Sequence, residues 1–384
     1  GRAPMHPNSC RPHGAAGALH LREKAKLAPA GSIRSSAEFR RHPRLWIFPP
    51  STSSGKAHMS LRLSAAWPYA EVREIDVYGE NYGLDFCRLN PNMTVPVLEI
   101  EDKVISDSWL IADYLCQRYA GDGDCRAIYA GKGQLLSHFV ALAASWDEAL
   151  YLHGKRNSGR LVNRLRLARL RQRYAEITEE AEEDEDDEES TEGSDSCGPQ
   201  GRYRGSRGGE KHLEAYVRKI AEIQHFDDVT GAGEEAGKAL RRALQDNQQT
   251  LDRIFSMAEE LLQGSPEDGF LLGRELTTAD AFLLPVLCRV QDVRPRDMRR
   301  YLGRHPSVAD YWSRARETEE AQVVLGPATC CRGTGCYRLA SPPLLKRMVP
   351  CQLLGVRCGC VCAPDLPEEV EERIREAQAE LRRS

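Results

Sequence analysis

Residues 90–115, NPNMTVPVLEIEDKVISDSWLIADYL, restrict the possible folds more than any other part of the chain. Two short apolar runs, at 97–100 and 104–105, lie on either side of a polar turn and predict a β-hairpin. Apolar side chains then recur at helical spacing, so a helix follows directly. Its start carries Asp107 and Ser108, residue types that are common at the beginning of helices. The segment therefore predicts a hairpin that leads straight into a helix.

The preceding residues supply the other elements of a small sheet domain. Residues 44–48 predict a strand, residues 51–54 are a run of helix-capping residues, and residues 56–66 predict a helix. Residues 72–77 alternate loosely between apolar and polar and predict a second strand. Strand, helix, strand, loop, strand, strand, helix is the thioredoxin-like order, with the first two strands parallel and the hairpin antiparallel. We expect this α/β thioredoxin-like domain to fill residues 44–120.

Residues 132–325 predict an all-α helical-bundle domain, because no convincing strand pattern occurs from residue 135 onward. One stretch inside this domain differs from the rest. Residues 181–209 are acidic at first and then rich in Gly, Arg and Ser. Such a segment cannot bury enough apolar surface to offset the entropy lost on ordering, so we predict a disordered insertion.

The two ends of the chain differ in composition from the middle. Residues 1–43 are rich in Arg, His, Ser, Ala and Pro, which suits a disordered extension or an organellar transit peptide. Residues 326–384 form a Cys-rich tail with an isolated charged helix at 368–383. The chain has 13 cysteines, an odd number that indicates mostly free thiols in a reducing compartment. We therefore expect a cytoplasmic protein, or a plastid or mitochondrial one if residues 1–43 are a transit peptide.

Charge and hydropathy argue against several other classes of protein. The 53 Lys and Arg nearly balance the 57 Asp and Glu, which leaves a net charge of −4. A basic stretch at 155–173 precedes an acidic run at 179–189, and we expect a solvated or self-neutralised face there rather than a nucleic-acid or lipid surface. No window has the ~18 uninterrupted apolar residues of a transmembrane helix. The closely spaced cysteines at 358–362 lack the ligand pattern of a zinc site, so we expect no metal.

The order of motifs over residues 44–325, apart from the insertion, resembles the glutathione transferase superfamily. The shared pattern is Asn-Pro, Val-Pro, two strands, an acidic residue with serine, and a helix. Residues 45–63 are similar to the zeta-type segment of the family, and Thr277 with Asp280 resemble its capping box in the helical domain. The long insertion resembles the ganglioside-induced differentiation-associated protein 1 subgroup, whose membrane anchor we do not expect in this tail.

The resemblance implies a detoxification enzyme that activates the thiol of glutathione through a serine hydroxyl. The enzyme transfers glutathione, its co-substrate, to an electrophilic small molecule. The implied site residues are Ser51 as the activating serine, Ser53 as the second candidate, Val95 on a cis Val95–Pro96 bond against the cysteinyl part, Asp107 and Ser108 at the γ-glutamyl end, Lys56 at the glycyl end and Thr94 through its main chain.

Each of these roles has a simpler structural alternative. In this alternative, the serines at 51–54 serve only to cap the first helix, and Pro96 is a trans proline that begins an edge strand. In the same alternative, Asp107 and Ser108 serve only to cap the helix that they begin. For the whole protein, the alternative is a non-catalytic binding or scaffold protein on the same fold. Superfamily members commonly pair as homodimers, so a homodimer is expected unless the insertion blocks that surface.

Overall fold

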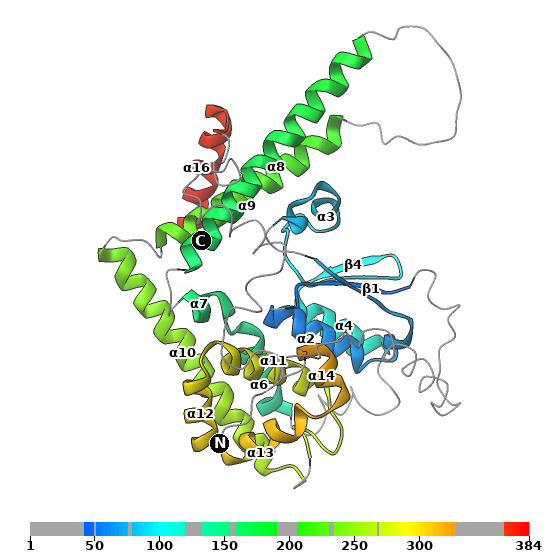
Figure 1. The fold of residues 1–384 in the computed structure, drawn as a ribbon, viewed down its shortest axis with the longest axis vertical. Helices are drawn as coiled ribbons and strands as arrows, with labels where there is room; N and C mark the ends of the chain where they lie inside the picture. The colour runs from blue at the N-terminus through cyan, green and yellow to red at the C-terminus, as the bar shows by residue number, and fades with distance from the viewer. Residues whose placement is uncertain are drawn as a thin grey trace, which may run out of the picture.

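Three parts are visible in Figure 1: a small sheet domain, a helical domain packed against it, and a long helical arm. The computed structural model describes residues 42–49, 51–75, 79–119, 133–153, 158–189, 206–229, 234–266, 269–326 and 365–383. The predicted architecture, an α/β thioredoxin-like domain followed by an all-helical domain, is confirmed.

The sheet has four strands in the order β2-β1-β3-β4. β1 is parallel to β2 and antiparallel to β3, and β3 is antiparallel to β4, as the sequence predicts. A helix joins the two parallel strands, because only a crossover can return the chain to the starting edge of the sheet. The elements of this domain are β1 (Arg44–Ile47), α2 (Thr52–Arg62), η3 (Trp67–Tyr69), β2 (Glu71–Glu74), η4 (Glu80–Tyr82), α3 (Leu84–Leu89), β3 (Val97–Ile100), β4 (Lys103–Ser106) and α4 (Ser108–Tyr119).

Helices α2 and α4 cover one face of the sheet, and α3 covers the other. Alternation along β1 directs Leu45 and Ile47 to the first face, where they are buried with Leu61 of α2 and other side chains of α2 and α4. Trp46 points to the second face, where its ring meets the ring of Phe86 edge-on at 6.0 Å between centroids. Each face of the sheet is therefore closed by apolar contacts.

The helical domain packs around α11, most of whose side chains are buried. The capping box predicted at its start is present: Asp280 Oδ2 accepts from Thr277 N at 2.7 Å. The core of this domain also contains Met59 of α2 and Ala112 of α4, so it joins the two domains. Its elements are α6 (Gly133–Ser145), α7 (Glu148–His153), α10 (Glu234–Gln263), α11 (Thr278–Val293), α12 (Pro295–Arg304), α13 (Pro306–Ala315) and α14 (Glu319–Leu325).

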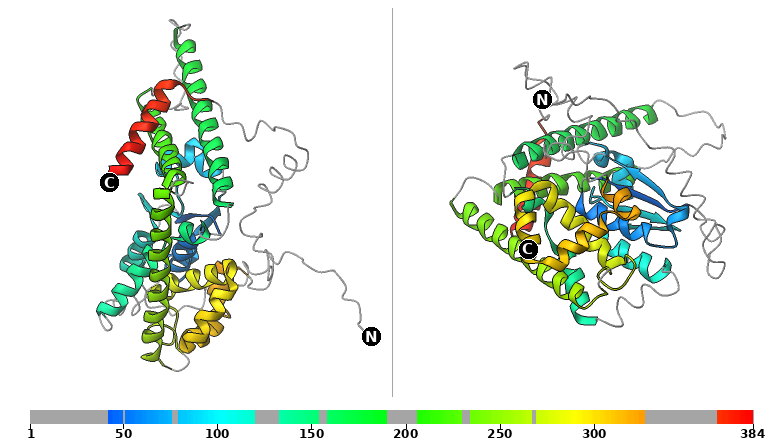
Figure 2. Two further views of the ribbon diagram at one scale, coloured as in Figure 1. Left: turned by 90° about the vertical axis from the view of Figure 1, so that its left-hand side faces the viewer. Right: turned by 60° about the horizontal axis from the view of Figure 1, so that its bottom comes forward.

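The helical arm consists of α8 (Ser158–Glu189), α9 (Ser206–Val229) and α16 (Glu368–Arg383), which extend beyond the sheet domain (Figure 1, Figure 2). Helix α16 packs along α9, and its buried Val370 and Ile374 share an apolar core with residues of α9. The prediction of an isolated C-terminal helix is therefore wrong. The helix carries an apolar stripe that only a neighbouring helix can keep from water.

The arm is also attached to the sheet domain. Arg166 Nε of α8 donates to the hydroxyl oxygen of Tyr82 at 2.7 Å, and the Tyr216 hydroxyl of α9 donates to the carbonyl of Tyr82. Met93, two residues before Val95, is buried in the same apolar core as Tyr216. The arm therefore supports the loop that leads into β3.

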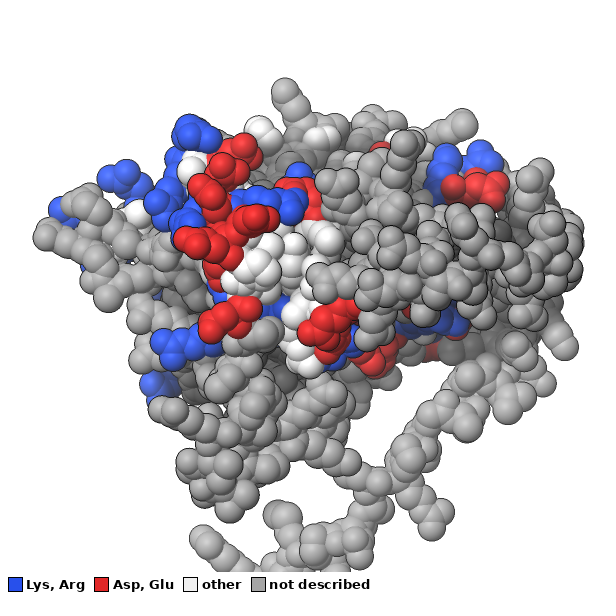
Figure 3. Space-filling model, turned by 90° about the horizontal axis from the view of Figure 1, so that it is seen from above, with Lys and Arg blue, Asp and Glu red and all other residues white. Residues whose placement is uncertain are grey.

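Basic side chains of the arm have acidic neighbours. Arg171 pairs with Glu371 of α16, and Arg173 pairs with Glu176 one turn away. Figure 3, which looks down on the arm, shows basic and acidic side chains next to one another around an uncharged patch. Neither acidic partner belongs to the run at 179–189, so neutralisation of the basic stretch by that run stays a prediction.

Several predictions concern residues outside the described part of the chain. Residues 1–41 and 327–364 are among them, and with them most of the N-terminal extension and the Cys-rich segment of the tail. Helices α8 and α9 extend into both ends of the insertion predicted at 181–209, of which residues 190–205 are not described.

Three further findings apply to the described residues alone. Cys87 and Cys288 are not in disulfide bonds, and Cys116 is disulfide-bonded. Within this part of the chain, no helix combines the length and the apolar character needed to cross a bilayer. In the same residues, no three His, Cys, Asp or Glu side chains form a group suited to a metal ion.

Candidate functional site

Three segments of the chain meet at one edge of the sheet. β3 runs antiparallel to β1 with Val97 opposite Trp46, so β3 begins where β1 ends. Ser106, the last residue of β4, is the other partner of Val97. The residues that follow β1, precede β3 and follow β4 therefore lie at the same edge. The predicted site residues in these segments are Ser51, Val95, Pro96, Asp107 and Ser108.

The Val95–Pro96 peptide bond is cis, as predicted. Two buried asparagines hold the loop before it. Asn81 Nδ2 donates to the carbonyl of Met93 at 2.8 Å, and Asn90 Nδ2 donates to the carbonyl of Thr94 at 2.8 Å. Asn90 Nδ2 also donates to the Thr94 hydroxyl oxygen at 3.2 Å. The sequence pattern gave no role to Asn81, because its partner is fixed only by the fold of the loop.

Helix α4 starts at the same edge and is capped by its own neighbour. Asp107 Oδ1 accepts from Trp109 N at 2.7 Å and from Leu110 N at 3.2 Å. Asp107 has a φ of 90°, a conformation that costs an L residue about 1–3 kcal/mol and that is concentrated at functional sites. Ser108 follows with its side chain buried. The predicted pair therefore lies at a helix N-terminus, with Asp107 as the cap.

Ser51 is the N-cap of α2. Its Oγ accepts from Ser54 N at 3.4 Å, while Ser54 Oγ accepts from Phe48 N at 3.1 Å. Accepting this bond does not use the hydroxyl proton of Ser51, which is still able to donate. Ser53, the second candidate, lies in the first turn and is half-buried. Capping and donation to a bound sulfur are therefore compatible roles for Ser51.

The start of α2 also faces an ion pair from the helical domain that sequence reasoning missed. Thr52 N donates to Glu148 Oε2 of α7 at 2.7 Å, and Glu148 Oε1 pairs with Arg289 of α11. The Arg289 side chain is 6% exposed. Thr52 and Glu148 are 96 positions apart, so no local pattern announces their contact.

Helix α10 fixes the position of Glu148 through its neighbour. Asp147 N donates to Asn247 Oδ1 at 3.0 Å, and Asn247 Nδ2 donates back to the carbonyl of Asp147 at 2.8 Å. Asp147 Oδ1 also accepts from Leu150 N at 2.9 Å and so caps α7. Two opposed bonds to one buried asparagine hold the junction between α6 and α7 in place.

Lys56 does not lie as predicted. Its side chain is 1% exposed, and Nζ donates to the carbonyl of Ala143 in α6 at 2.5 Å. Burial lowers the pKa of the Lys56 amine to about 8, and the carboxylates of Glu148 and Asp107 oppose this shift. The predicted contact with the glycyl end of glutathione is therefore corrected. Lys56 lies one helical turn before Met59, so it shares the face of α2 that packs on the helical domain.

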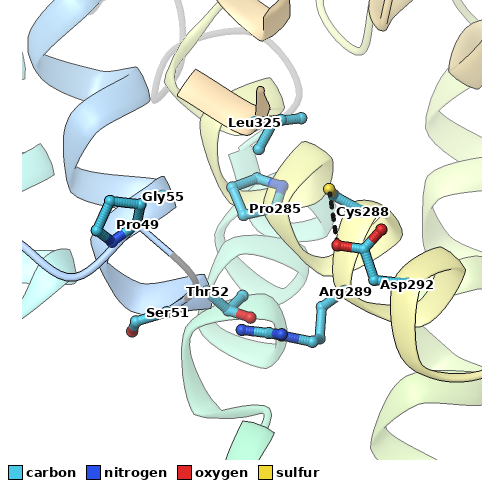
Figure 4. A pocket seen from close by; sticks show the side chains of 9 residues that line it. All are labelled: Pro49, Ser51, Thr52, Gly55, Pro285, Cys288, Arg289, Asp292 and Leu325. Carbon is cyan, nitrogen blue, oxygen red and sulfur yellow. Dashed lines mark hydrogen bonds between the residues drawn. The ribbon is translucent and has the colours of Figure 1, made fainter. Parts of the chain in front are cut away.

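A small pocket opens between the start of α2 and helix α11 (Figure 4). It is lined by Pro49, Ser51, Thr52, Gly55, Pro285, Cys288, Arg289, Asp292 and Leu325. Val95, Pro96 and Ser108 are not among these residues. The pocket and the sheet edge therefore share the start of α2 but are different surfaces.

Comparison with protein families matches two parts of the chain. Residues 45–123 match the glutathione S-transferase N-terminal domain, and residues 239–311 match the glutathione S-transferase C-terminal domain. The chain belongs to the glutathione transferase superfamily. The matched ranges comprise the sheet domain and part of the helical domain, and the helical arm lies outside them.

Solved structures similar to this chain have low sequence identity to it. Glutathione transferase F2 from Populus trichocarpa is 17% identical with a TM-score of 0.38, over 74% of this chain and 97% of its own. Beta-etherase LigF from Sphingobium sp. strain SYK-6 is 13% identical with a TM-score of 0.45, over 74% and 98%. A glutathione transferase homologue from Drosophila mojavensis with bound glutathione is 16% identical with a TM-score of 0.37, over 74% and 94%. No curated protein sequence matches the chain, so the family assignment rests on the two domain matches.

Proposed function

We propose that this chain binds glutathione at the sheet edge and transfers it to an electrophilic small molecule. One observation carries the proposal: the amino end of α2, the cis Val95–Pro96 bond and the amino end of α4 converge at one edge of the sheet. Membership of the glutathione transferase superfamily supports the same ligand.

Each segment at this edge has a role that its chemistry supports. The main chain of Val95 pairs with the cysteinyl part of glutathione, as an added strand would. The amino end of α4, with Ser108, attracts the γ-glutamyl carboxylate through its amides and its dipole. Asp107 holds that helix start in place and meets the γ-glutamyl amine. Ser51 donates its hydroxyl proton to the sulfur, and Ser53 is the second candidate for this donation.

Glutathione binding without turnover is the second candidate function. It is favoured by the bond from Thr52 N to Glu148, because a thiolate at the start of α2 has to share that position with a carboxylate. A protein of this kind keeps the ligand site and loses the activated sulfur.

A calorimetric titration with glutathione tests the proposal. We expect Ser108→Ala to weaken binding about tenfold, since a hydrogen bond to a charged group contributes about 1.5 kcal/mol or more. Ser51→Ala should leave the affinity nearly unchanged and raise the pKa of the bound thiol. Ser256→Ala, at an exposed serine of α10, is the matched control. No binding by the unaltered chain would refute the proposal, whereas binding without conjugation of an electrophile would favour the second function.

Three further expectations stay predictions. They are the identity of the electrophile as a small molecule, pairing into a homodimer, and a cytoplasmic location. Sedimentation of the purified chain measures directly whether it forms a homodimer.

A further inference from the structure

The amino end of α2 receives a carboxylate from the other domain. Glu148 Oε2 accepts from Thr52 N at 2.7 Å, and the second carboxylate oxygen pairs with Arg289. The Arg289 side chain is 6% exposed and the Glu148 side chain 18%, so salt and water screen this pair only weakly. Figure 4 shows Arg289 reaching from α11 toward Thr52.

An activated thiol needs the same position. Free amides and the dipole at a helix N-terminus favour an anion and lower the pKa of a nearby thiol. In α2, the Thr52 amide donates to Glu148 and the Ser54 amide donates to Ser51 Oγ, so two of the first three amides already have acceptors. A thiolate at this place would also be repelled by the Glu148 carboxylate.

We propose that Glu148 acts as an internal anion at the start of α2 and limits the fraction of bound glutathione that is a thiolate near neutral pH. The inference rests on the proposed glutathione site and adds to it a residue of the helical domain that sets the charge of the sulfur. Glu148 acts through the Thr52 amide and the local field rather than on the reacting atoms. It is therefore a positioning residue.

The surrounding groups predict what happens when the charge of Glu148 is removed. One buried cation, Arg289, remains near the start of α2 and loses its partner. The hydroxyl of Thr52 is also buried and has no hydrogen-bond partner among the described residues. The Arg289 guanidinium and the freed Thr52 amide then favour a thiolate at this position.

The test measures the ionisation of bound glutathione by its ultraviolet thiolate absorbance, in the full chain saturated with glutathione. We expect Glu148→Gln to increase the thiolate fraction near neutral pH about tenfold, because an adjacent like charge typically raises a pKa by a unit or more. Arg289→Gln should decrease the fraction, since it leaves the carboxylate without its counter-charge. The double variant should return close to the unaltered chain.

Two controls separate this effect from damage to the fold. Circular dichroism and thermal unfolding report whether each variant is folded, and Glu148→Asp retracts the carboxylate by one methylene if the glutamine variant is unstable. We expect the aspartate variant to increase the thiolate fraction by less than the glutamine variant. S-methylglutathione has no thiol to ionise, so its affinity should be equal for the unaltered chain and Glu148→Gln.

The outcomes distinguish this inference from the proposed function. If glutathione binds and its thiolate fraction is the same in the unaltered chain and in the folded Glu148 variants, the inference is overturned and the binding site stands. If neither the unaltered chain nor any variant binds glutathione, both are overturned. An increase of the thiolate fraction in Glu148→Gln together with a decrease in Arg289→Gln supports both, and a decrease in Glu148→Gln overturns the inference.

Discussion

The two helices that start at the site edge are capped in different ways. At α4, Asp107 accepts from the amides of Trp109 and Leu110, two and three positions further along the chain. At α2, the Thr52 amide donates to Glu148, which comes from another domain and is held by Arg289. One helix start is completed by its own segment, and the other is completed by tertiary contacts.

This difference separates two parts of the proposed glutathione site. The amino end of α4 is a local structure, because its cap, Asp107, comes from the same segment. The amino end of α2 has a chemistry that depends on how the helical domain packs, because Asn247 and Arg289 determine where Glu148 lies. Ligand binding is therefore expected to depend on the amino end of α4, and thiol activation on the amino end of α2.

The largest expected effect on stability comes from removing the tertiary contact that completes the start of α2. Glu148→Ala leaves the buried Arg289 guanidinium without its partner, and removing one member of such a pair costs about 3–5 kcal/mol. Denaturant unfolding of the variant should show a loss of this size. Glu260→Ala, at an exposed position of α10, is the control and should change stability by less than about 0.5 kcal/mol. A loss below about 1 kcal/mol for Glu148→Ala would mean that the pair contributes little to the start of α2.

The second expected effect is a gain in stability, and it concerns Lys56, which lies on the same helix. The pKa of its amine is about 8 in the folded chain, below the ordinary value of 10.5. Between these values the unfolded chain holds a proton that the folded chain has released, so the unfolding free energy contributed by Lys56 rises with pH across this window. At pH 7, this shift of the pKa lowers the free energy of unfolding by about 3 kcal/mol.

Lys56→Met should therefore stabilise the chain at pH 7 by as much as about 3 kcal/mol, with a gain that shrinks as the pH approaches 10.5. Unfolding measured at several pH values checks both the size and the trend. Lys238→Met, at an exposed lysine of α10, should show neither effect. A gain that does not depend on pH would show that the amine is not the cause.

The smallest effect compares the two caps directly. Asp107 Oδ1 accepts from two amides at 2.7 and 3.2 Å, whereas Ser51 Oγ accepts from one at 3.4 Å. We expect Asp107→Ala to cost about 1–2 kcal/mol and Ser51→Ala less than about 1 kcal/mol. Asp107→Gly should cost less than the alanine variant, because glycine adopts a φ of 90° without strain. An equal or larger loss for Ser51→Ala would reverse the comparison.

Elements whose partners are close in the sequence were predictable. The hairpin at β3 and β4, the helix start at Asp107 and the capping box at Thr277 each follow from residues a few positions apart. The cis Val95–Pro96 bond was predicted through the family resemblance. The burial of Lys56 and the packing of α16 on α9 were not predicted, because a long or charged side chain on a helix does not reveal which neighbour covers it.

The sequence by itself therefore determined the order of the sheet domain and the group of residues at its edge, because turn residues and hydrophobic periodicity act over a few positions. Tertiary structure alone decided which charges meet at the start of α2. Glu148 and Arg289 belong to helices that the chain brings to Thr52 only when the helical domain packs on the sheet domain. Burial in that interface gives their charges an influence that neither residue has in an unfolded chain.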